Sequence, residues 1–251
     1  MIDKFGVEYS DDGKTLIKCP KEFVGEYVIP EGVTEIGDYA FSGCQSLSEV
    51  VIPEGVTKID EGAFLNCKNL VKVSLPTSLL HMEHAAFSMC GKLKNFVIPQ
   101  GVTRIEQYAF AESGLRRITL PTSLTSIGTC AFKDCFFLSV IDIPSSVTSI
   151  ESGAFDGASL AVVKFPNQVR TIGSMAFDYI GIEYLILSSP NPVDYVALVN
   201  AMTSDEMNRI TLLVPVGSED NFNNDNRYQY FKGVMSEAFA RELGLLGFWK
   251  V

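Results

Sequence analysis

The sequence has few of the residues on which common catalytic and nucleic-acid sites depend. Only 2 of its 251 residues are histidine, so a hydrolase with a Ser–His or Cys–His pair would have to use one of these two. Lysine and arginine number 20 against 30 aspartates and glutamates, and the net charge of −10 argues against general binding to nucleic acid or anionic membranes. The sequence also lacks a run of about 18 apolar residues and a glycine-rich phosphate loop. It therefore predicts neither an enzyme nor a membrane-spanning helix.

The two histidines lie close together in the segment His81-Met82-Glu83-His84. This segment differs from the HExxH motif, and no third metal ligand lies nearby in the sequence. We expect both side chains to be solvated on the surface, and a weak metal site is the alternative. The prediction is that the protein has no metal, no cofactor and no catalytic residue.

What the sequence does contain is one pattern, repeated seven times at intervals of 22 or 23 residues. A proline recurs at this interval, and a phenylalanine follows each proline by eleven residues. The prolines are Pro30, Pro53, Pro76, Pro99, Pro121, Pro144 and Pro166, and the phenylalanines are Phe41, Phe64, Phe87, Phe110, Phe132, Phe155 and Phe177. A period of this length is typical of a solenoid, in which each coil buries its faces against its neighbours.

Each repeat predicts two short extended segments and a compact turn. In residues 50–72, the apolar alternation before Pro53 predicts a strand, which the proline ends because it has no N–H. Residues 56–59 predict a second extended segment, and residues 60–67 predict one or two helical turns. We expect the seven phenylalanines to stack in the core. The predicted fold class is α/β, a right-handed leucine-rich-repeat solenoid of ~23-residue coils with short parallel strands about 4.8 Å apart and short helical turns.

Four of the six cysteines occupy one position of the repeat, where Ser113 and Ala158 stand in two other coils. These four are Cys44, Cys67, Cys90 and Cys135. Because the position accepts only small residues, we expect a buried ladder of reduced thiols. Disulfides are disfavoured because side chains of adjacent parallel coils point the same way, and a metal site is disfavoured because no CxxC pair exists. Unpaired thiols argue against a permanently oxidising compartment.

Strand residues two and four positions before each proline are predicted to point outward onto a concave surface. On the middle coils, together with residues five before the proline, they gather cations and apolar side chains on an otherwise acidic protein. The predicted binding strip is Glu49, Val51, Lys72, Ser74, Lys94, Val97, Arg116, Arg117, Thr119 and Asp142, and the outward series continues to Val162 and Ile186. Such a strip suits an acidic peptide or glycan, because arginine binds carboxylates in a bidentate manner. Ordinary solvated β-surface is the alternative.

Because each coil contacts mainly its neighbours, the two ends of the stack need caps. Residues 1–26 are predicted to form the N-terminal cap, with a hairpin that turns at residues 11–13. Residues 27–187 form the solenoid of about seven repeats and a final strand, and residues 188–251 form the C-terminal cap. In that cap we expect helices at 194–202 and 236–246, a strand at 210–214 and a polar loop at 220–227. Ser236 is the candidate N-cap of the last helix, and Trp249 either packs on the cap or is exposed.

Residues 29–47 and 52–70 carry the repeat motif best, as I-P-x-x-V-T-x-I-x-x-x-A-F-x-x-C-x-x-L. This motif resembles the BspA-type leucine-rich repeats of bacterial surface proteins. The resemblance covers residues 5–187 and extends weakly to 212–218. It implies adhesion and binding to host or matrix proteins, and it supplies no catalytic residues.

The leading functional hypothesis is a non-catalytic protein- or glycan-binding module, at the cell surface or secreted, that uses the concave strand face. The alternative is an intracellular scaffold for a protein partner. The two hypotheses differ in whether the protein is exported. No apolar stretch typical of a signal peptide follows residues 1–5. An upstream leader would favour the first hypothesis, and a native start at Met1 would favour the second.

We expect a monomer with a protein or glycan ligand, an acidic one being favoured. A third reading, an enzyme, would need a deep polar pocket with a perturbed titratable group.

Overall fold

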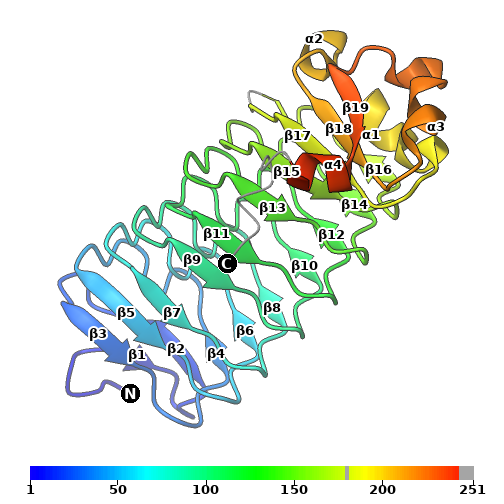
Figure 1. The fold of residues 1–251 in the computed structure, drawn as a ribbon. Helices are drawn as coiled ribbons and strands as arrows, with labels where there is room; N and C mark the ends of the chain where they lie inside the picture. The colour runs from blue at the N-terminus through cyan, green and yellow to red at the C-terminus, as the bar shows by residue number, and fades with distance from the viewer. Residues whose placement is uncertain (179–180, 243–251) are drawn as a thin grey trace.

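The computed structural model describes residues 1–178 and 181–242 and shows a stack of similar coils with an antiparallel hairpin at the N-terminal end and short helices at the other (Figure 1). Each coil up to β17 contributes a strand to each of two parallel strips, and β18 and β19 extend the first strip alone. The first strip, whose outer side we name the strand face, contains β3 (Gly25–Val28), β5 (Leu47–Val51), β7 (Lys72–Ser74), β9 (Asn95–Val97), β11 (Arg117–Thr119), β13 (Val140–Asp142), β15 (Val162–Phe165), β17 (Tyr184–Leu187), β18 (Thr211–Val214) and β19 (Gly233–Ser236). The second strip contains β2 (Thr15–Lys18), β4 (Glu35–Ile36), β6 (Lys58–Ile59), β8 (His81–Met82), β10 (Arg104–Ile105), β12 (Ser126–Ile127), β14 (Ser149–Ile150) and β16 (Thr171–Ile172).

Most strands of successive coils pair in parallel and in register, as the predicted solenoid requires. Glu49 lies opposite Lys72, and Asn95 lies opposite Arg117. The strand face consists of three hydrogen-bonded sheets, β3-β5-β7, β9-β11 and β13-β15-β17-β18-β19. The predicted fold class is thus confirmed as a parallel solenoid with few helices.

The repeated phenylalanines form one continuous stack through the centre of the coils. Neighbouring rings in this stack have centroids 4.9–5.8 Å apart and planes within 13° of parallel. All seven side chains are buried. Because each ring packs against the rings of the coils before and after it, the stack couples the stability of neighbouring coils.

The segments around these phenylalanines differ from the predicted helical turns, because they are series of tight turns. Residues two before and two after most of the phenylalanines, such as Gly62 and Asn66 around Phe64, have left-handed φ angles of 56° and 60°. The Phe64 N–H donates to the carbonyl oxygen of Ala86 in the next coil at 2.9 Å, whereas in a helix it would bond within its own segment. The left-handed residues turn alternate N–H groups toward the neighbouring coil, and this prevents a continuous helix.

The N-terminal end begins with the predicted hairpin, in which β1 (Glu8–Tyr9) pairs antiparallel with β2. The Tyr9 and Tyr27 hydroxyls are hydrogen-bonded, and the Tyr27 hydroxyl donates to Asp3 at 2.6 Å. The ring of Tyr27 also lies 5.9 Å from that of Phe41, the first ring of the stack. The hairpin and these tyrosines therefore cover the open end of the core. The division of the chain at residues 26 and 187 stays a prediction.

The C-terminal end contains short helices on two further strands. Its helices are η1 (Pro192–Tyr195), α1 (Val196–Asn200), α2 (Ser204–Met207), α3 (Glu219–Asn223), η2 (Asn226–Tyr228) and α4 (Glu237–Glu242). The predicted strand at 210–214 corresponds to β18, and the predicted helix at 194–202 to η1 and α1. The Phe239 N–H donates to Ser236 Oγ at 3.1 Å, which confirms Ser236 as a helix cap.

The prediction of a polar loop at 220–227 was wrong, because α3 and η2 occupy much of it. The cause is Phe222, which is fully buried and packs edge-on against Tyr228 with ring centroids 5.1 Å apart. This single apolar anchor outweighs the many asparagines and aspartates around it. Residues 243–246 of the predicted last helix, and Trp249, lie outside the described residues.

Candidate functional site

The ten residues of the predicted binding strip lie on the strand face, on or directly before strands β5 to β13. Of these, Lys72, Lys94, Val97, Arg116, Arg117, Thr119 and Asp142 are exposed, and Glu49, Val51 and Ser74 are half-buried. The buried partners of this alternation, such as Phe96 on β9 and Ile118 on β11, face the core. Strand geometry explains the pattern, because successive side chains point to opposite sides of a sheet.

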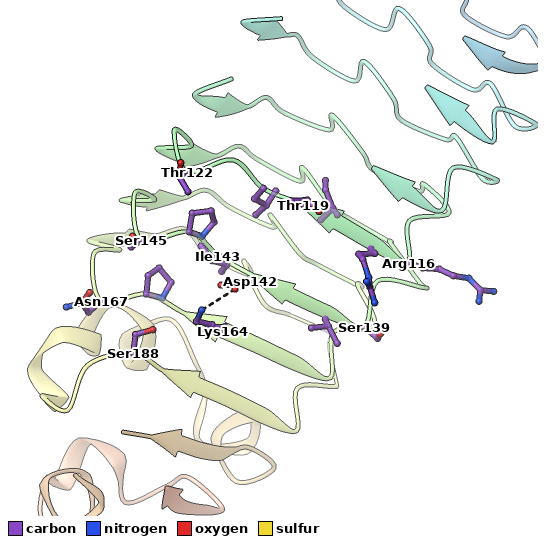
Figure 2. A pocket seen from close by; sticks show the side chains of 16 residues that line it. Arg116, Thr119, Thr122, Ser139, Asp142, Ile143, Ser145, Lys164, Asn167 and Ser188 are labelled. Atoms are coloured by element: carbon purple, nitrogen blue, oxygen red, sulfur yellow. Dashed lines mark hydrogen bonds and ion pairs between the residues drawn. The ribbon is translucent and has the colours of Figure 1, made fainter. Parts of the chain in front are cut away.

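A groove of about 660 Å³ crosses the strand face over β11, β13 and β15 (Figure 2). Four residues of the predicted strip line it, namely Arg116, Arg117, Thr119 and Asp142. The other six, which are Glu49, Val51, Lys72, Ser74, Lys94 and Val97, lie outside it on the earlier coils. The candidate site is therefore shifted toward the C-terminal coils relative to the centre of the predicted strip.

The groove lies across a boundary in the strand pairing. Strands β11 and β13 belong to adjacent coils, yet they are in separately hydrogen-bonded sheets. The floor of the groove includes Ile143 and Pro144, which follow β13 at its carboxyl end. The groove is lined by both apolar and polar residues, so it can bury apolar groups of a ligand and orient its polar groups.

The charges around the groove differ in whether they have partners. Lys164 pairs with Asp142 at 3.1 Å, and on earlier coils Lys72 pairs loosely with Glu49 at 3.9 Å. In contrast, Lys94, Arg116 and Arg117 make no ion pair with any residue that the structure describes. These three cations can therefore bind an anionic ligand without first breaking an internal ion pair.

Phe136 and Phe137 were missed by the sequence analysis and lie beside this site. Their side chains are 61% and 56% exposed, and the Arg116 guanidinium lies over the Phe137 ring, 5.7 Å from its centroid. A signal for them exists in the sequence. The two residues after the cysteine position are Gln45-Ser46, Lys68-Asn69 and Gly91-Lys92 in the earlier coils. The Phe-Phe pair is thus a departure from the repeat on the exposed side.

The strand face is covered at its C-terminal end, and here the predicted outward series was wrong. Val162 and Ile186, expected to point into solvent, are buried with Leu213 and Ala240 in a second hydrophobic cluster. Ala240 belongs to α4, which lies across the strands at this end (Figure 1). Because α4 lies outside the repeat, the repeat pattern could not predict this cover. The open part of the face thus ends near the groove.

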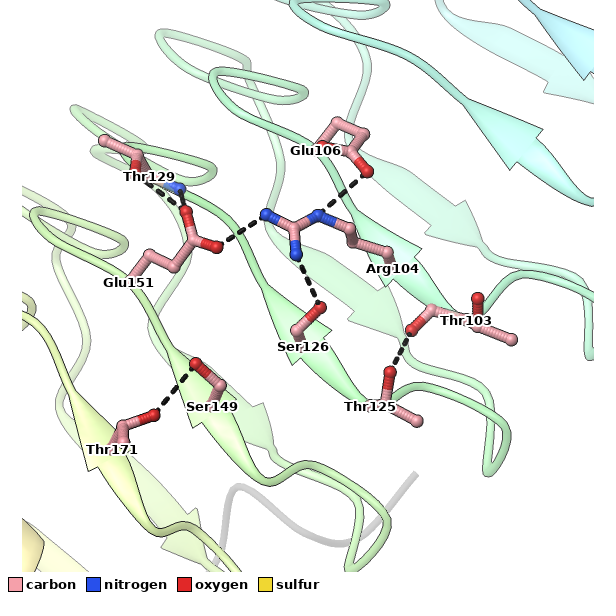
Figure 3. A network of polar contacts seen from close by, with 9 residues as sticks. All are labelled: Thr103, Arg104, Glu106, Thr125, Ser126, Thr129, Ser149, Glu151 and Thr171. Atoms are coloured by element: carbon pink, nitrogen blue, oxygen red, sulfur yellow. Dashed lines mark hydrogen bonds and ion pairs between the residues drawn. The ribbon is translucent and has the colours of Figure 1, made fainter.

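The second strip carries charges too, but they are paired between coils (Figure 3). Arg104 contacts Glu106 at 2.9 Å in its own coil and Glu151 at 2.5 Å, two coils further along. Burial alone would raise the pKa of Glu151, but hydrogen bonds from Thr129 and Arg104 outweigh it and hold this pKa below its usual value. Burial likewise opposes the charge of Arg104, yet the two carboxylates leave its pKa raised. This network stabilises the stack and leaves no free charge on Arg104.

The four cysteines of the repeat column lie in the core as free thiols. The Cys67 thiol donates to the Phe41 carbonyl oxygen at 3.0 Å, and the Cys90 thiol donates to that of Phe64 at 3.2 Å. Each thiol thus ties its coil to the preceding one. Burial raises the pKa of Cys90 to about 12 and that of Cys135 to about 11, so these thiols stay protonated at neutral pH.

The histidine segment assembles no metal centre within the described residues. His81 is exposed on β8, and the His84 ring packs edge-on against Tyr108 with centroids 5.6 Å apart. No group of three or more histidine, cysteine or acidic side chains is placed to hold a metal ion in that part of the chain. None of the helices in residues 1–178 and 181–242 combines the length and apolarity needed to cross a bilayer.

Two solved structures of bacterial proteins are similar to this chain. One is a leucine-rich repeat protein from Bacteroides ovatus, with 25% identity, a TM-score of 0.53, and alignment over 75% of this chain and 61% of that chain. The other is a leucine rich cell surface protein from Faecalibacterium prausnitzii, with 25% identity, a TM-score of 0.52, and alignment over 76% of this chain and 57% of that chain. The chain therefore spans less than two thirds of either protein. No curated protein matches it.

The model of the BspA type leucine rich repeat region matches residues 21–139 and 131–197 of this chain, with six copies of the repeat. These residues cover more than half of the sequence and include all seven stacked phenylalanines and the strands that line the groove. Leucine-rich repeat proteins generally serve as protein-interaction modules. This chain belongs to the BspA-type leucine-rich repeat family.

Proposed function

We propose that this chain is a non-catalytic protein-binding module that holds its partner against the open part of the strand face, centred on the groove beside Arg116 and Arg117. The observation that carries the proposal is the conjunction of that groove with arginines that have no internal ion-pair partner among the described residues. Arginine is enriched in interface hot spots and binds carboxylates with two parallel hydrogen bonds. A partner surface with carboxylates fits this chemistry best.

The proposed location is the cell surface, and the proposed process is adhesion or recognition of a host or matrix protein. Support comes from the family and from the solved Faecalibacterium prausnitzii relative, which is described as a cell surface protein. A glycan ligand with carboxylate groups shares the chemistry that Arg116 and Arg117 would recognise. Binding to a glycan and not to a protein would redirect the proposal to that class of ligand.

The test is binding of the purified chain to a panel of matrix proteins, acidic peptides and glycans, at low and at physiological salt. The Arg116→Glu/Arg117→Glu variant reverses the two free cations, and Lys68→Glu/Lys92→Glu makes the same change of charge at exposed residues outside the groove. We expect salt-sensitive binding that weakens at least tenfold in the first variant and stays nearly unchanged in the second. Equal effects of the two variants would contradict a site at the groove.

A second candidate function is an intracellular scaffold, favoured by one specific observation. All six cysteines are free, and free thiols persist best in reducing compartments. Exposure of the chain to protease added outside intact cells distinguishes the two locations. Digestion supports the surface module, and protection until lysis supports the scaffold.

A further inference from the structure

The coil that contains Phe136 and Phe137 presents two aromatic rings to solvent where other coils present polar residues or glycine. Phe136 and Phe137 are 61% and 56% exposed, although buried phenylalanine is the rule in this core. Their backbone is firmly held, because the Phe136 N–H donates to Asp134 O at 3.0 Å and the Leu138 N–H donates to Cys135 O at 3.1 Å. Two large apolar side chains are thus displayed on a fixed turn, which reduces the entropy lost when a partner covers them.

These rings are next to cations that lack internal ion pairs. The Arg116 guanidinium lies over the Phe137 ring at 5.7 Å, and Arg117 is the next residue along the chain. A guanidinium over an aromatic face keeps its N–H edges available for a carboxylate. The Arg116 guanidinium and the Phe137 ring therefore offer positive charge and apolar area at one point, on the side of the groove where Arg116 lies (Figure 2). We name Arg116, Phe137 and the adjacent Phe136 the aromatic rim.

We propose that the aromatic rim selects a partner segment in which a carboxylate lies next to an aromatic or large apolar side chain. This rests on the proposed function, because it specifies which protein segment the groove accepts. The carboxylate pairs with Arg116 or Arg117, and the neighbouring side chain packs on the two phenylalanine rings. Charge complementarity favours an acidic partner segment over a basic one. A basic segment would meet the like charges of Lys94, Arg116 and Arg117. The carboxylate on β13, Asp142, is already paired with Lys164 and could not offset this repulsion.

The apolar half of the motif follows from the size of the rings. A phenylalanine side chain buries about 150–250 Å² when covered, and buried aromatic side chains supply much of the binding energy of many interfaces. A segment with carboxylates alone would leave both rings in water and gain little beyond a screened ion pair. A segment with aromatic residues and lysines would bring like charges together. Only a partner segment that has both carboxylates and aromatic side chains can contact both Arg116 and the two phenylalanine rings.

The test uses three synthetic peptides of equal length, with Asp and Phe, Asp and Ser, or Lys and Phe interleaved, titrated into the full chain and followed by fluorescence anisotropy. The variant Phe136→Gln/Phe137→Ser copies the residues Gln45 and Ser46 of an earlier coil. The matched control Val24→Ser/Val28→Ser removes two apolar side chains that are 75% and 61% exposed at the N-terminal coil. Thermal unfolding of each variant checks that the fold is retained.

We expect the Asp–Phe peptide to bind the wild-type chain at least tenfold tighter than either other peptide. The Phe136→Gln/Phe137→Ser variant should lose this preference and bind the Asp–Phe and Asp–Ser peptides equally, whereas the Val24/Val28 control should keep it. Phe137→Leu, which keeps an apolar side chain without a ring, should retain part of the preference. Equal binding of the Asp–Phe and Lys–Phe peptides to the wild-type chain would overturn the inference.

The outcome also separates the inference from the proposed function. A protein partner lost in Arg116→Glu/Arg117→Glu but bound normally by Phe136→Gln/Phe137→Ser would leave the groove as the binding site and overturn the role of the aromatic rim. A partner that binds both variants as tightly as it binds the wild-type chain would overturn both proposals. Loss in both variants, with the Val24/Val28 control unaffected, supports both.

Discussion

The two strand strips of this solenoid have the same architecture but differ in whether the arginines of their middle coils have ion-pair partners. On the second strip, Arg104 forms ion pairs with a carboxylate of its own coil and with one of a coil two repeats away, so its charge is neutralised within the protein. On the strand face, Arg116 and Arg117 have no such carboxylate among the described residues, and a groove opens beside them. Charges paired between coils stabilise the stack, and charges left unpaired are available to a partner.

The core beneath both strips should give the largest response to substitution. Phe110 stacks between Phe87 and Phe132, with centroid distances of 5.8 and 5.6 Å, and is fully buried. Phe110→Ala should lower the free energy of unfolding by about 3–5 kcal/mol, because it leaves a cavity that interrupts the stack. Urea denaturation followed by circular dichroism measures this.

Phe177→Ala is the control for this experiment, because among the described residues Phe177 has one parallel-stacked neighbour, Phe155, and an edge-on contact with Phe165, and it is slightly exposed. It should lower stability less than Phe110→Ala. Equal costs at both positions would show that the stack does not couple neighbouring coils.

The contrast between the strips predicts a crossed effect of two arginine substitutions. Arg104→Met should lower stability by about 0.5–1 kcal/mol through the loss of its ion pairs, with partner binding unchanged. Arg117→Met should weaken partner binding several-fold and leave stability nearly unchanged. Both readouts on both variants are needed, and a stability loss for Arg117→Met as large as that for Arg104→Met would contradict the distinction.

Acidic pH should weaken the second strip at Glu151. The pKa of Glu151 lies below the usual 4.5, so the unfolded chain binds this proton more readily than the folded chain. Its stabilising contribution is present above the usual pKa and disappears as the pH falls through the folded value. Glu151→Gln should therefore lower stability at pH 7 but have little effect near pH 2, measured by urea midpoints at both. An equal loss at both pH values would assign its role to packing.

The smallest predicted effect concerns the turns, which belong to neither strip. Met89 is left-handed, with φ of 61°, and its side chain is partly exposed. Met89→Gly should raise the free energy of unfolding by about 0.5 kcal/mol. Glycine gains because it avoids the steric cost of a Cβ in this conformation, and the gain is small because glycine loses more conformational entropy on folding. Met89→Ala keeps the Cβ and should give no gain. A gain for alanine equal to that for glycine would point to the methionine side chain and not to the backbone.

The repeated interior was predictable because its residues recur at fixed intervals. Pro53 and Phe64 alone place a strand end and a core ring, and the same spacing holds in the other coils. The turns were predicted as helical because residues 60–67 have helix-like apolar spacing. Their conformation is instead set by backbone hydrogen bonds to the next coil, such as that from the Phe64 N–H. No local pattern reports such bonds.

The candidate site was predicted in part, and its missing pieces have a common cause. Arg116 and Arg117 were found because they follow the repeat register of the strands. Phe136 and Phe137 depart from the repeat outside that register, and α4 covers Val162 from a segment with no repeat at all. Features that follow the repeat are readable from one sequence, and features that break it require the folded arrangement.

The interrupted strand pairing between β11 and β13 has a mechanical consequence. Backbone hydrogen bonds between coils run along the solenoid, so a force that pulls the two ends apart acts on each coil boundary in series. The boundary between β7 and β9 also lacks strand pairing, and there the second strip is interrupted too, between β8 and β10, so that boundary should open first and the one below the groove next. Each detached coil then releases about 22 residues, or roughly 75 Å of extended chain. A partner bound across β11 and β13 would bridge this boundary and resist its opening, while the boundary between β7 and β9 would stay as weak as before.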